Sequence, residues 1–226
     1  MNLLAIDTAT EACSAALSVK DNISNLFEVC PQQHSQRLLP MVDSLLQQAN
    51  VSLQNLDVLG FGRGPGSFTG VRIATAMLQG LALGAELKCA GISTMATMAQ
   101  QAIEQCSAQD IVVTIDARMG EVYFAHYKNA EGVATLVGQE AVLSPQTAAS
   151  LLPTRAFHSV GTGWQSYAQE LACENMTGTD ILYPDARFMI ALVQQAVNNG
   201  DICDVEQVEP SYVRDTVTWK KLPGRE

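Results

Sequence analysis

Positive charge is scarce in this chain of 226 residues. Lysine and arginine number 13 against 23 aspartates and glutamates, which gives a formal net charge of −10 at pH 7. Proteins that bind nucleic acid by themselves usually present a basic face, because the release of condensed counterions drives that binding. The charge balance therefore argues against autonomous nucleic-acid binding and leaves room only for local basic patches.

Cysteine pairs, a leader peptide and long apolar runs are also lacking. The six cysteines form no CxxC pair, and most lie in apolar runs, where cysteine acts as a small hydrophobic residue. The N-terminus has no basic segment and reaches Asp7 too soon for a signal peptide. No apolar run approaches the ~20 residues that span a bilayer. We therefore expect a soluble, reduced, cytoplasmic protein without membrane contact.

Histidine is rare, and proline is too infrequent to prevent folding. No two of the three histidines have the spacing of metal ligands. His34 precedes a predicted helix and is interpreted as a side chain that bonds the local backbone. Hydrophobic residues make up 47% of the chain, with eight prolines, so it can bury a core. Its length suits one large domain or two small ones.

Short apolar runs and helical spacing predict an ordered α/β chain in its first half. The order is three strands, helix, strand, helix, strand, helix. The strands are expected at residues 3–7, 13–19, 23–29, 57–62 and 88–92, and the helices at 35–50, from 67 and from 93.

The same order begins again after residue 110. Three strands, a short helix, a strand and two helices are expected at residues 111–116, 121–127, 133–143, 145–152, 156–161, 164–175 and 186–199. Two local echoes support a duplication: AIDTA at residues 5–9 returns as TIDAR at 114–118, and FGRG at 61–64 returns as VGTG at 160–163. The repeat predicts an α/β fold with two lobes, each a βββαβα unit, as in actin, Hsp70 and sugar kinases.

This architecture sets the expected domains but not the function. We expect a first lobe at residues 1–106 and a second at 107–226, with the segment after about Asp185 packing back toward the first lobe. Proteins of this architecture hold a nucleotide between their lobes, so a nucleotide site has to be considered.

The loop GRGPGSFTGVR, which starts at Gly62, is the most specific stretch of the chain. Gly64 and Gly66 allow backbone angles that other residues avoid, and Pro65 stiffens the turn. Ser67 or Thr69 is placed to cap the next helix, whose free N–H groups then form a candidate anion site. A tight strand-to-helix turn without a ligand is the other reading. The loop is not a P-loop, because it lacks the Gly-Lys-Ser/Thr ending.

Four sequence blocks resemble the TsaB (YeaZ) family. They are LLAIDTATEACSAAL, GRGPGSFTGVRIATAMLQGLA, TIDARMGEVYFAHY and VEPSYVR, in that order along nearly the whole chain. The resemblance implies a non-catalytic subunit of the machinery that forms threonylcarbamoyladenosine at position 37 of tRNA. It implies pairing with TsaD, a paralogue that transfers the threonylcarbamoyl group, and docking of an ATPase, TsaE, on the pair. ATP and magnesium would serve the assembled complex, this chain would need no cofactor of its own, and it would meet tRNA only through the complex.

The resemblance also indicates where chemistry is missing. TsaD carries an HxxxH metal-binding pair after the strand that follows its Gly-Pro-Gly loop, and Thr94 and Met98 occupy those places here. Neither is a credible ligand for a hard cation. We therefore predict no stoichiometric zinc, iron or manganese in the purified chain, which elemental analysis would check.

A candidate nucleotide or anion site remains at the ends of the two opening strands and at the glycine loop. It comprises Asp7, Gly64, Gly66, Ser67 and Asp116. The two aspartates are placed to orient a magnesium-bound water, but an aspartate that ends a strand is also an ordinary turn former. The second hairpin has bulky residues at 117–119, so efficient ATP hydrolysis by this chain alone is not expected.

Two predicted helices offer surfaces for a partner. The second carries Ala76, Gly80 and Gly84 along one face, and each glycine costs about 1 kcal/mol relative to alanine, so a close neighbour is expected there. That neighbour is a helix of the same lobe or of another subunit. The first helix has a broad apolar surface formed by Leu38, Leu39, Met41, Val42, Leu45 and Leu46. The resemblance implies that both helices meet TsaD and that isolated chains self-associate as dimers through the same face.

Two other classes compete with a non-catalytic subunit. A small-molecule kinase or ATPase of the same fold would bind and turn over nucleotide by itself. A metallopeptidase would hold zinc, which the missing HxxxH argues against.

Overall fold

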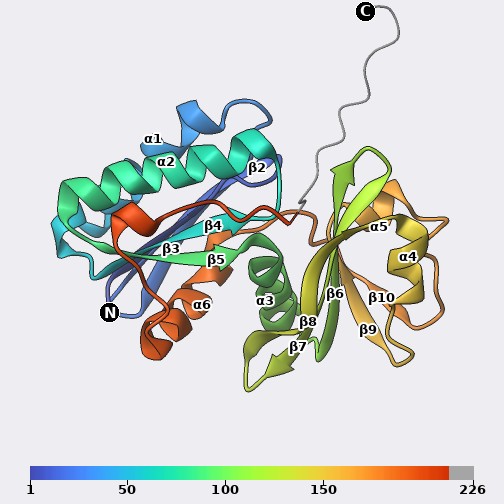
Figure 1. Ribbon diagram of the computed structural model, residues 1–226. Helices are drawn as coiled ribbons and strands as arrows, with labels where there is room; N and C mark the ends of the chain where they lie inside the picture. Colours follow the sequence, from blue (N-terminus) through green and yellow to red (C-terminus); the bar gives the residue numbers. More distant parts are fainter. Residues whose placement is uncertain (214–226) are drawn as a thin grey trace, which may run out of the picture.

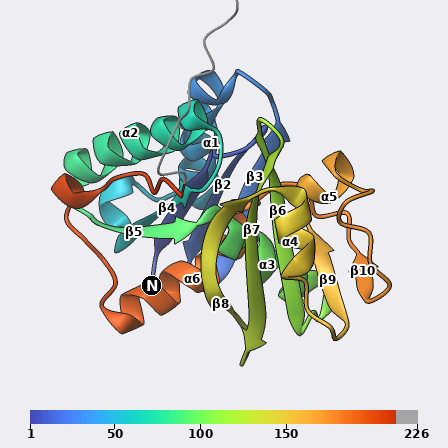
Figure 2. The ribbon, with the colours of Figure 1, turned by 45° about the vertical axis from the view of Figure 1, so that its right-hand side comes forward.

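A computed structural model describes residues 1–213 of the protein as two mixed β-sheets with helices on their faces (Figures 1 and 2). The expected second lobe runs to residue 226, and the VEPSYVR block ends at Arg214. These last positions lie outside the described residues.

The first sheet is built around the opening strand. In spatial order it reads β3-β2-β1-β4-β5. The strands are β1 (Leu3–Asp7), β2 (Ala12–Val19), β3 (Asn22–Val29), β4 (Val58–Gly64) and β5 (Lys88–Ser93). β1 is antiparallel to β2 and parallel to β4, and all five of its residues are buried. A strand covered on both faces reads as a continuous apolar run, as this one does.

The second sheet repeats this topology strand for strand. Its order is β10-β9-β6-β7-β8, with β6 in the central place that β1 holds in the first sheet. The strands are β6 (Asp110–Arg118), β7 (Glu121–Ala130), β8 (Val133–Leu143), β9 (Phe157–Val160) and β10 (Met176–Gly178). β6 is antiparallel to β7 and parallel to β9. The predicted duplicated α/β fold is thereby confirmed.

Helices form three layers around the two sheets (Figure 1). α1 (His34–Ala49) and α2 (Phe68–Ala85) cover the outer face of the first sheet, and α3 (Thr94–Cys106) and α6 (Ala186–Asn199) lie on the inner side of the sheets. The short α4 (Pro145–Ser150) and α5 (Gly163–Ser166) cover the outer face of the second sheet. The helix expected at 164–175 ends at Ser166, so most of that prediction is wrong.

Each helix layer has its own hydrophobic core. One core joins α1 and α2 to the first sheet, and another joins α4 and α5 to the second. The largest lies between the sheets, where Met95 and Met98 of α3 meet Met189 of α6. Burial of a large apolar side chain contributes about 1.5–3 kcal/mol, so this middle layer holds the lobes together.

Small polar residues cap the N-termini of α2, α3 and α6, whereas α1 has no side-chain cap. Ser67 caps α2 and Ser93 caps α3, each through a side-chain oxygen that accepts a backbone N–H. Asp185 caps α6 in the same way. Such caps are worth about 1 kcal/mol each, and they fix where each helix leaves its strand or loop.

The chain returns to the first lobe after the second sheet is complete. α6 packs under β1, β2 and β5, and Val193 takes the space that a side chain at Gly60 would need. Residues 203–213, which we call the C-terminal strap, then cross the first lobe beside α2 (Figure 1). Two short 3₁₀ helices, Leu53–Asn55 and Val205–Gln207, complete the described elements. No helix within residues 1–213 is long and apolar enough to cross a membrane.

Candidate functional site

The glycine loop between β4 and α2 is packed tightly against the turn that follows β1. The N–H of Ser67 donates to the carbonyl of Ala9 at 2.7 Å, and the Thr8 hydroxyl donates to the Gly70 carbonyl at 2.7 Å. A Cβ at Gly66 would lie 2.2 Å from the Ala9 carbonyl oxygen, and one at Gly70 would lie 2.1 Å from that of Thr8. These glycines are therefore required for close approach of two backbone segments.

Ser67 and Gly64 have structural tasks in the same loop. The Ser67 hydroxyl accepts the N–H of Gly70 at 3.3 Å, so one N-terminal donor of α2 is used inside the protein. Gly64 has φ of +103°, a conformation that favours glycine, and the peptide bond to Pro65 is cis. The loop is therefore a capped strand-to-helix turn, and anion binding at it stays a prediction.

Asp7 ends β1 as a fully buried carboxylate. Its Oδ1 accepts the N–H of Ala9 at 2.8 Å, and its Oδ2 accepts the Thr94 hydroxyl at 3.3 Å. Burial raises the pKa of Asp7 to about 7, against the opposing effect of these two hydrogen bonds. A side chain at Gly62 would overlap the carboxylate, so that glycine makes room for it.

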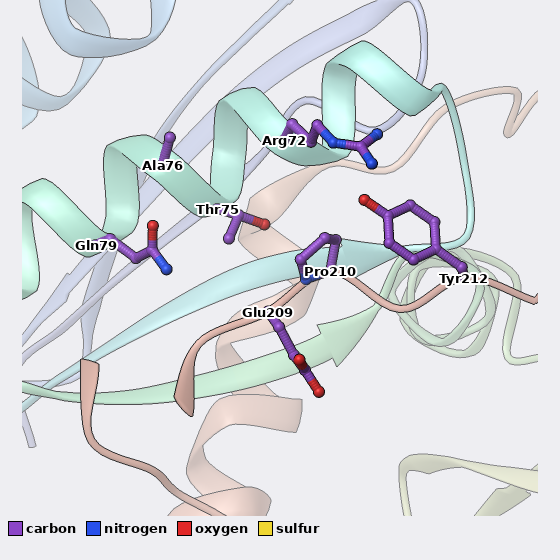
Figure 3. Close-up of a pocket in the computed structure, with 7 residues that line it drawn as sticks. All are labelled: Arg72, Thr75, Ala76, Gln79, Glu209, Pro210 and Tyr212. Carbon is purple, nitrogen blue, oxygen red and sulfur yellow. The ribbon is translucent and has the colours of Figure 1, made fainter. Parts of the chain in front are cut away.

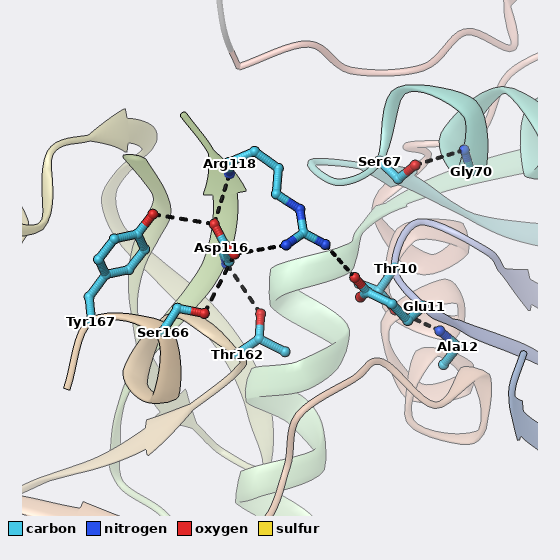
Figure 4. Close-up of polar contacts among 10 residues, drawn as sticks. All are labelled: Thr10, Glu11, Ala12, Ser67, Gly70, Asp116, Arg118, Thr162, Ser166 and Tyr167. Carbon is cyan, nitrogen blue, oxygen red and sulfur yellow. Dashed lines mark hydrogen bonds and ion pairs between the residues drawn. The ribbon is translucent and has the colours of Figure 1, made fainter. Parts of the chain in front are cut away.

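Asp116 lies two residues before the end of β6, in the place that corresponds to Asp7, and has a different set of partners (Figure 4). Its Oδ1 accepts the N–H of Arg118 at 2.8 Å, and the Arg118 guanidinium contacts Oδ2 at 3.1 Å. The hydroxyls of Ser166 and Tyr167 reach the carboxylate at 3.5 Å. Asp116 is thus bound by its own hairpin and by the region of α5.

Arg118 connects the two lobes. Its guanidinium donates to Glu11, in the turn between β1 and β2, at 2.9 Å while it also holds Asp116 (Figure 4). Tyr123 adds a second link, because its hydroxyl donates to the Gly66 carbonyl at 3.3 Å. The hairpins that face each other across the lobes are therefore joined by protein contacts.

The residues at the HxxxH places are part of the core. Thr94 and Met98 are fully buried, and a Cβ at Gly161 would meet Met98 at 3.4 Å. Within residues 1–213, no three histidine, cysteine or acidic side chains lie together in a group able to hold a metal ion. The Nε2 of His34 is buried without a partner among those residues, so this atom does not make the expected backbone hydrogen bond.

Comparisons with known proteins find relatives that match most or all of the chain. The family model described as "TsaD: tRNA N6-adenosine threonylcarbamoyltransferase" matches residues 27–215. The chain is 45% identical to the tRNA threonylcarbamoyladenosine biosynthesis protein TsaB of Escherichia coli K12 and 43% identical to that of Haemophilus influenzae. Both alignments cover 100% of this chain and at least 99% of the relative. The chain belongs to the TsaB family.

A solved TsaB-family structure supports the same assignment. YeaZ from Pseudomonas aeruginosa superposes with a TM-score of 0.88 at 40% identity, covering 93% of this chain and 99% of that one. This chain and that solved structure therefore share one fold.

The α1 helix of this TsaB-family chain does not offer the broad apolar surface that we expected. Four of the six residues assigned to that surface are buried in the core between α1, α2 and the first sheet. These are Leu38, Met41, Val42 and Leu45. Only Leu39, which is 46% exposed, is freely accessible, while Leu46 is partly buried. Helical spacing correctly identified the apolar residues of α1, but the first sheet and α2 together cover more of them than the sequence indicated.

The small residues of α2 lie on the outside. Ala76, Gly80 and Gly84 are exposed, and a Cβ at either glycine would meet nothing within 4 Å. The alternative that these glycines admit a helix of the same lobe is therefore wrong for the chain that the structure describes. Leu83, on the same helix, is 69% exposed.

Sequence reasoning missed the C-terminal strap as a neighbour of α2. Gln79 donates to the Val208 carbonyl at 2.9 Å, and the Arg72 guanidinium lies 3.3 Å from the ring centroid of Phe68 and 5.0 Å from that of Tyr212. A groove of about 590 Å³ lies between helix and strap (Figure 3). The VEPSYVR block was the available signal, but a motif does not say which helix it will touch.

Proposed function

We propose that this chain serves the formation of threonylcarbamoyladenosine at position 37 of tRNA as a non-catalytic subunit. It pairs with a TsaD-like transferase and helps to recruit a TsaE-like ATPase, in the cytoplasm. Full-length identity of 43–45% to curated TsaB proteins supports the pathway. The exposed face of α2 is the single observation that carries the role as a partner subunit.

That face is costly unless something covers it. Two glycines inside a helix lose about 1 kcal/mol each relative to alanine. No contact of the described residues offsets this loss, because the space above Gly80 and Gly84 is empty. A residue without a Cβ permits close approach of another backbone. The face formed by Ala76, Gly80, Leu83 and Gly84 therefore suits a helix of a second subunit.

Large apolar side chains are exposed near both ends of α2. Phe68 at the start of α2 is 67% exposed, and Leu83 near its end is 69% exposed. Leu83 adds exposed apolar area directly beside Gly84, and exposed apolar surface is a common mark of an interaction site. The same surface would join two copies of this chain when the TsaD-like partner is missing.

The lobes themselves offer little support for chemistry by this chain alone. Glu11 and Asp116 already occupy the guanidinium of Arg118, and the glycine loop bonds to the backbone of Ala9. Asp7 is fully buried, and one of its carboxylate oxygens accepts the Thr94 hydroxyl. We infer that ATP and magnesium serve the assembled complex and that this chain has no cofactor of its own.

The acidic composition supports an indirect role toward tRNA. A net charge of −10 repels a phosphate backbone unless a partner supplies the basic face. We therefore infer that tRNA is held by the complex.

Co-purification with the TsaD-like paralogue tests the proposal. Gly84→Leu adds a bulky side chain to the open face, so we expect loss of the complex in size-exclusion chromatography with unfolding close to that of the unchanged protein. Gln195→Leu places the same side chain at an exposed position of α6 and should leave the complex intact. Normal pairing of a Gly80→Leu, Gly84→Leu double variant would exclude α2 as the partner surface.

A nucleotide titration with a turnover assay separates this proposal from a kinase or ATPase. Robust hydrolysis of ATP by the isolated chain, lost on Asp116→Asn, would overturn the non-catalytic role. If such a chain still paired with the TsaD-like protein, the proposal that α2 is the partner surface would hold even though the non-catalytic role was wrong.

A further inference from the structure

Two cysteines face each other where the C-terminal strap meets the first sheet. Cys89 lies in β5, and Cys203 begins the strap as its antiparallel partner. Each donates its backbone N–H to the carbonyl of the other at 2.9 Å. Residues 114 positions apart in the chain are thereby brought into direct cross-strand register.

This register is close to the geometry of a disulfide. A hydrogen-bonded antiparallel pair has its Cα atoms about 5.5 Å apart, and disulfides span about 4.4–6.8 Å between Cα atoms. Side chains directly opposite each other point to the same face, with Cβ atoms about 4.5–5.5 Å apart, whereas a disulfide needs about 3.5–4.5 Å. The strap must therefore approach β5 by about one ångström. The backbone pairing at this point is an isolated bridge next to the Lys88–Asp204 ion pair, so the shift does not have to move a longer run of paired strand residues.

From this juxtaposition we propose that Cys89 and Cys203 form a reversible disulfide that locks the C-terminal strap onto β5 under oxidising conditions. The proposal is independent of the function proposed above. The oxidant is a small disulfide of the glutathione class.

The steps balance as two thiol–disulfide exchanges. The partly exposed Cys203 thiolate attacks glutathione disulfide, forms a mixed disulfide and releases one glutathione thiolate. The Cys89 thiolate then attacks the Cys203 sulfur and releases the second glutathione, so the chain loses two protons and two electrons. Both leaving thiolates take up protons from water.

The environment of Cys89 makes formation of the disulfide slow at neutral pH. Burial raises the pKa of Cys89 to about 12, with a further contribution from the nearby Cys203. Burial also raises the pKa of Cys203. Because only thiolates react, oxidation should accelerate as the pH rises.

A second close cysteine pair provides an internal comparison. Cys13 and Cys30 also lie near each other, but they are 0% and 4% exposed beneath α1. Glutathione disulfide has no route to sulfur atoms that are covered in this way, so this pair should stay reduced while the chain is folded.

The experiment oxidises the folded full-length chain with glutathione disulfide at about pH 8, where a larger thiolate fraction is present. Non-reducing peptide mapping should find one linked peptide pair that joins Cys89 to Cys203, reversed by dithiothreitol. Amide hydrogen exchange in residues 203–213 should slow by roughly tenfold or more, because local opening of the strap is suppressed. Cys106→Ser, a change at an exposed cysteine, should alter neither result.

Single substitutions decide the assignment. Cys203→Ser should abolish both the linked peptide and the slower exchange, and instead leave Cys89 reduced. If Cys89→Ser proves unstable, Cys203→Ser with an intact Cys89 carries the test alone. A disulfide between Cys13 and Cys30, or no intramolecular disulfide after prolonged oxidation, would overturn the proposal.

Discussion

The two lobes of this TsaB-family protein share a framework and differ in what covers it. In each sheet the first strand carries an aspartate at or near its C-terminal end, whose Oδ1 accepts a backbone N–H two residues later at 2.8 Å, Ala9 for Asp7 and Arg118 for Asp116. Asp7 is fully buried, whereas Asp116 is partly exposed and bound to Arg118. The two turns therefore share the same aspartate-to-backbone hydrogen bond, although one aspartate is buried and the other is paired with an arginine.

The covering helices diverge more than the sheets. The first lobe carries helices of 16 and 18 residues on its outer face, and the second carries helices of 6 and 4 residues. Short helices cover a strand and little else. A long helix such as α2 buries one side and leaves the other to present Ala76, Gly80 and Gly84. The longer outer helices thus give the first lobe a candidate docking surface.

The largest expected effect comes from glycines that touch the first strand of each lobe. Gly70→Ala would place a Cβ 2.1 Å from the Thr8 carbonyl oxygen, and Gly161→Ala would place one 2.2 Å from that of Thr114. Because the clash is with backbone, we expect each change to cost about 4 kcal/mol of unfolding free energy, measured by urea denaturation. Gly178→Ala, which meets nothing within 4 Å, is the control. Equal stability of all three variants would contradict the shared close packing.

A second expected effect concerns the buried aspartate of the first lobe. The pKa of Asp7 is about 7 in the folded protein and has a usual value of 3.8. Because the folded chain binds the Asp7 proton more tightly than the unfolded chain does, this proton stabilises the fold fully below pH 3.8. The stabilisation is lost as the pH rises through 7. The wild type should therefore lose about 2–3 kcal/mol of stability between pH 5 and pH 8 from this group.

Asp7→Asn should remove that loss, so the variant should gain on the wild type as the pH rises. Urea denaturation at both pH values measures the difference. Asp43→Asn, which removes a carboxylate from the exposed side of α1, controls for the change in net charge. If Asp7→Asn followed the same pH dependence as the wild type, the burial argument would fail.

The smallest expected effect concerns the link between the lobes. The Arg118 side chain is 72% exposed, and exposed ion pairs are worth about 0.2–1 kcal/mol. A double-mutant cycle of Glu11→Gln and Arg118→Gln should give a coupling energy of about 0.5 kcal/mol at low salt, and less in 1 M NaCl. A coupling above about 2 kcal/mol would mean that the pair is a major clamp between the lobes.

Sequence patterns predicted the strands well because the buried strands of this fold appear in the sequence as short, continuous apolar runs. β1 and β8 have their expected bounds, and α6 begins and ends at the expected residues 186 and 199. Ser67, one of two expected caps, does begin α2. Continuous apolar runs and capping residues are local signals, so they survive without knowledge of the tertiary structure.

The site was harder to predict because its contacts are non-local. Glu11 and Arg118 are 107 residues apart, and no periodicity reports such a pair. Helical spacing also cannot tell an outward apolar residue from one that a neighbouring helix covers, which is why Leu38 and Leu45 were assigned to the surface. Conversely, the sequence did not show whether Gly80 faces its own lobe or the solvent. In the structure, a Cβ at this position would meet nothing within 4 Å.

The return of α6 to the first lobe has a consequence for synthesis on the ribosome. The first sheet is complete at Ser93, but the helix that covers its inner face begins only at Ala186. At about 5–20 residues per second, roughly 5–20 s pass before that helix is translated. During this interval α3 contacts β4 and β5 on the inner face, while the apolar surface that α6 later covers on β1, β2 and β3 stays open. We therefore expect the nascent first lobe to expose apolar surface until α6 has been translated.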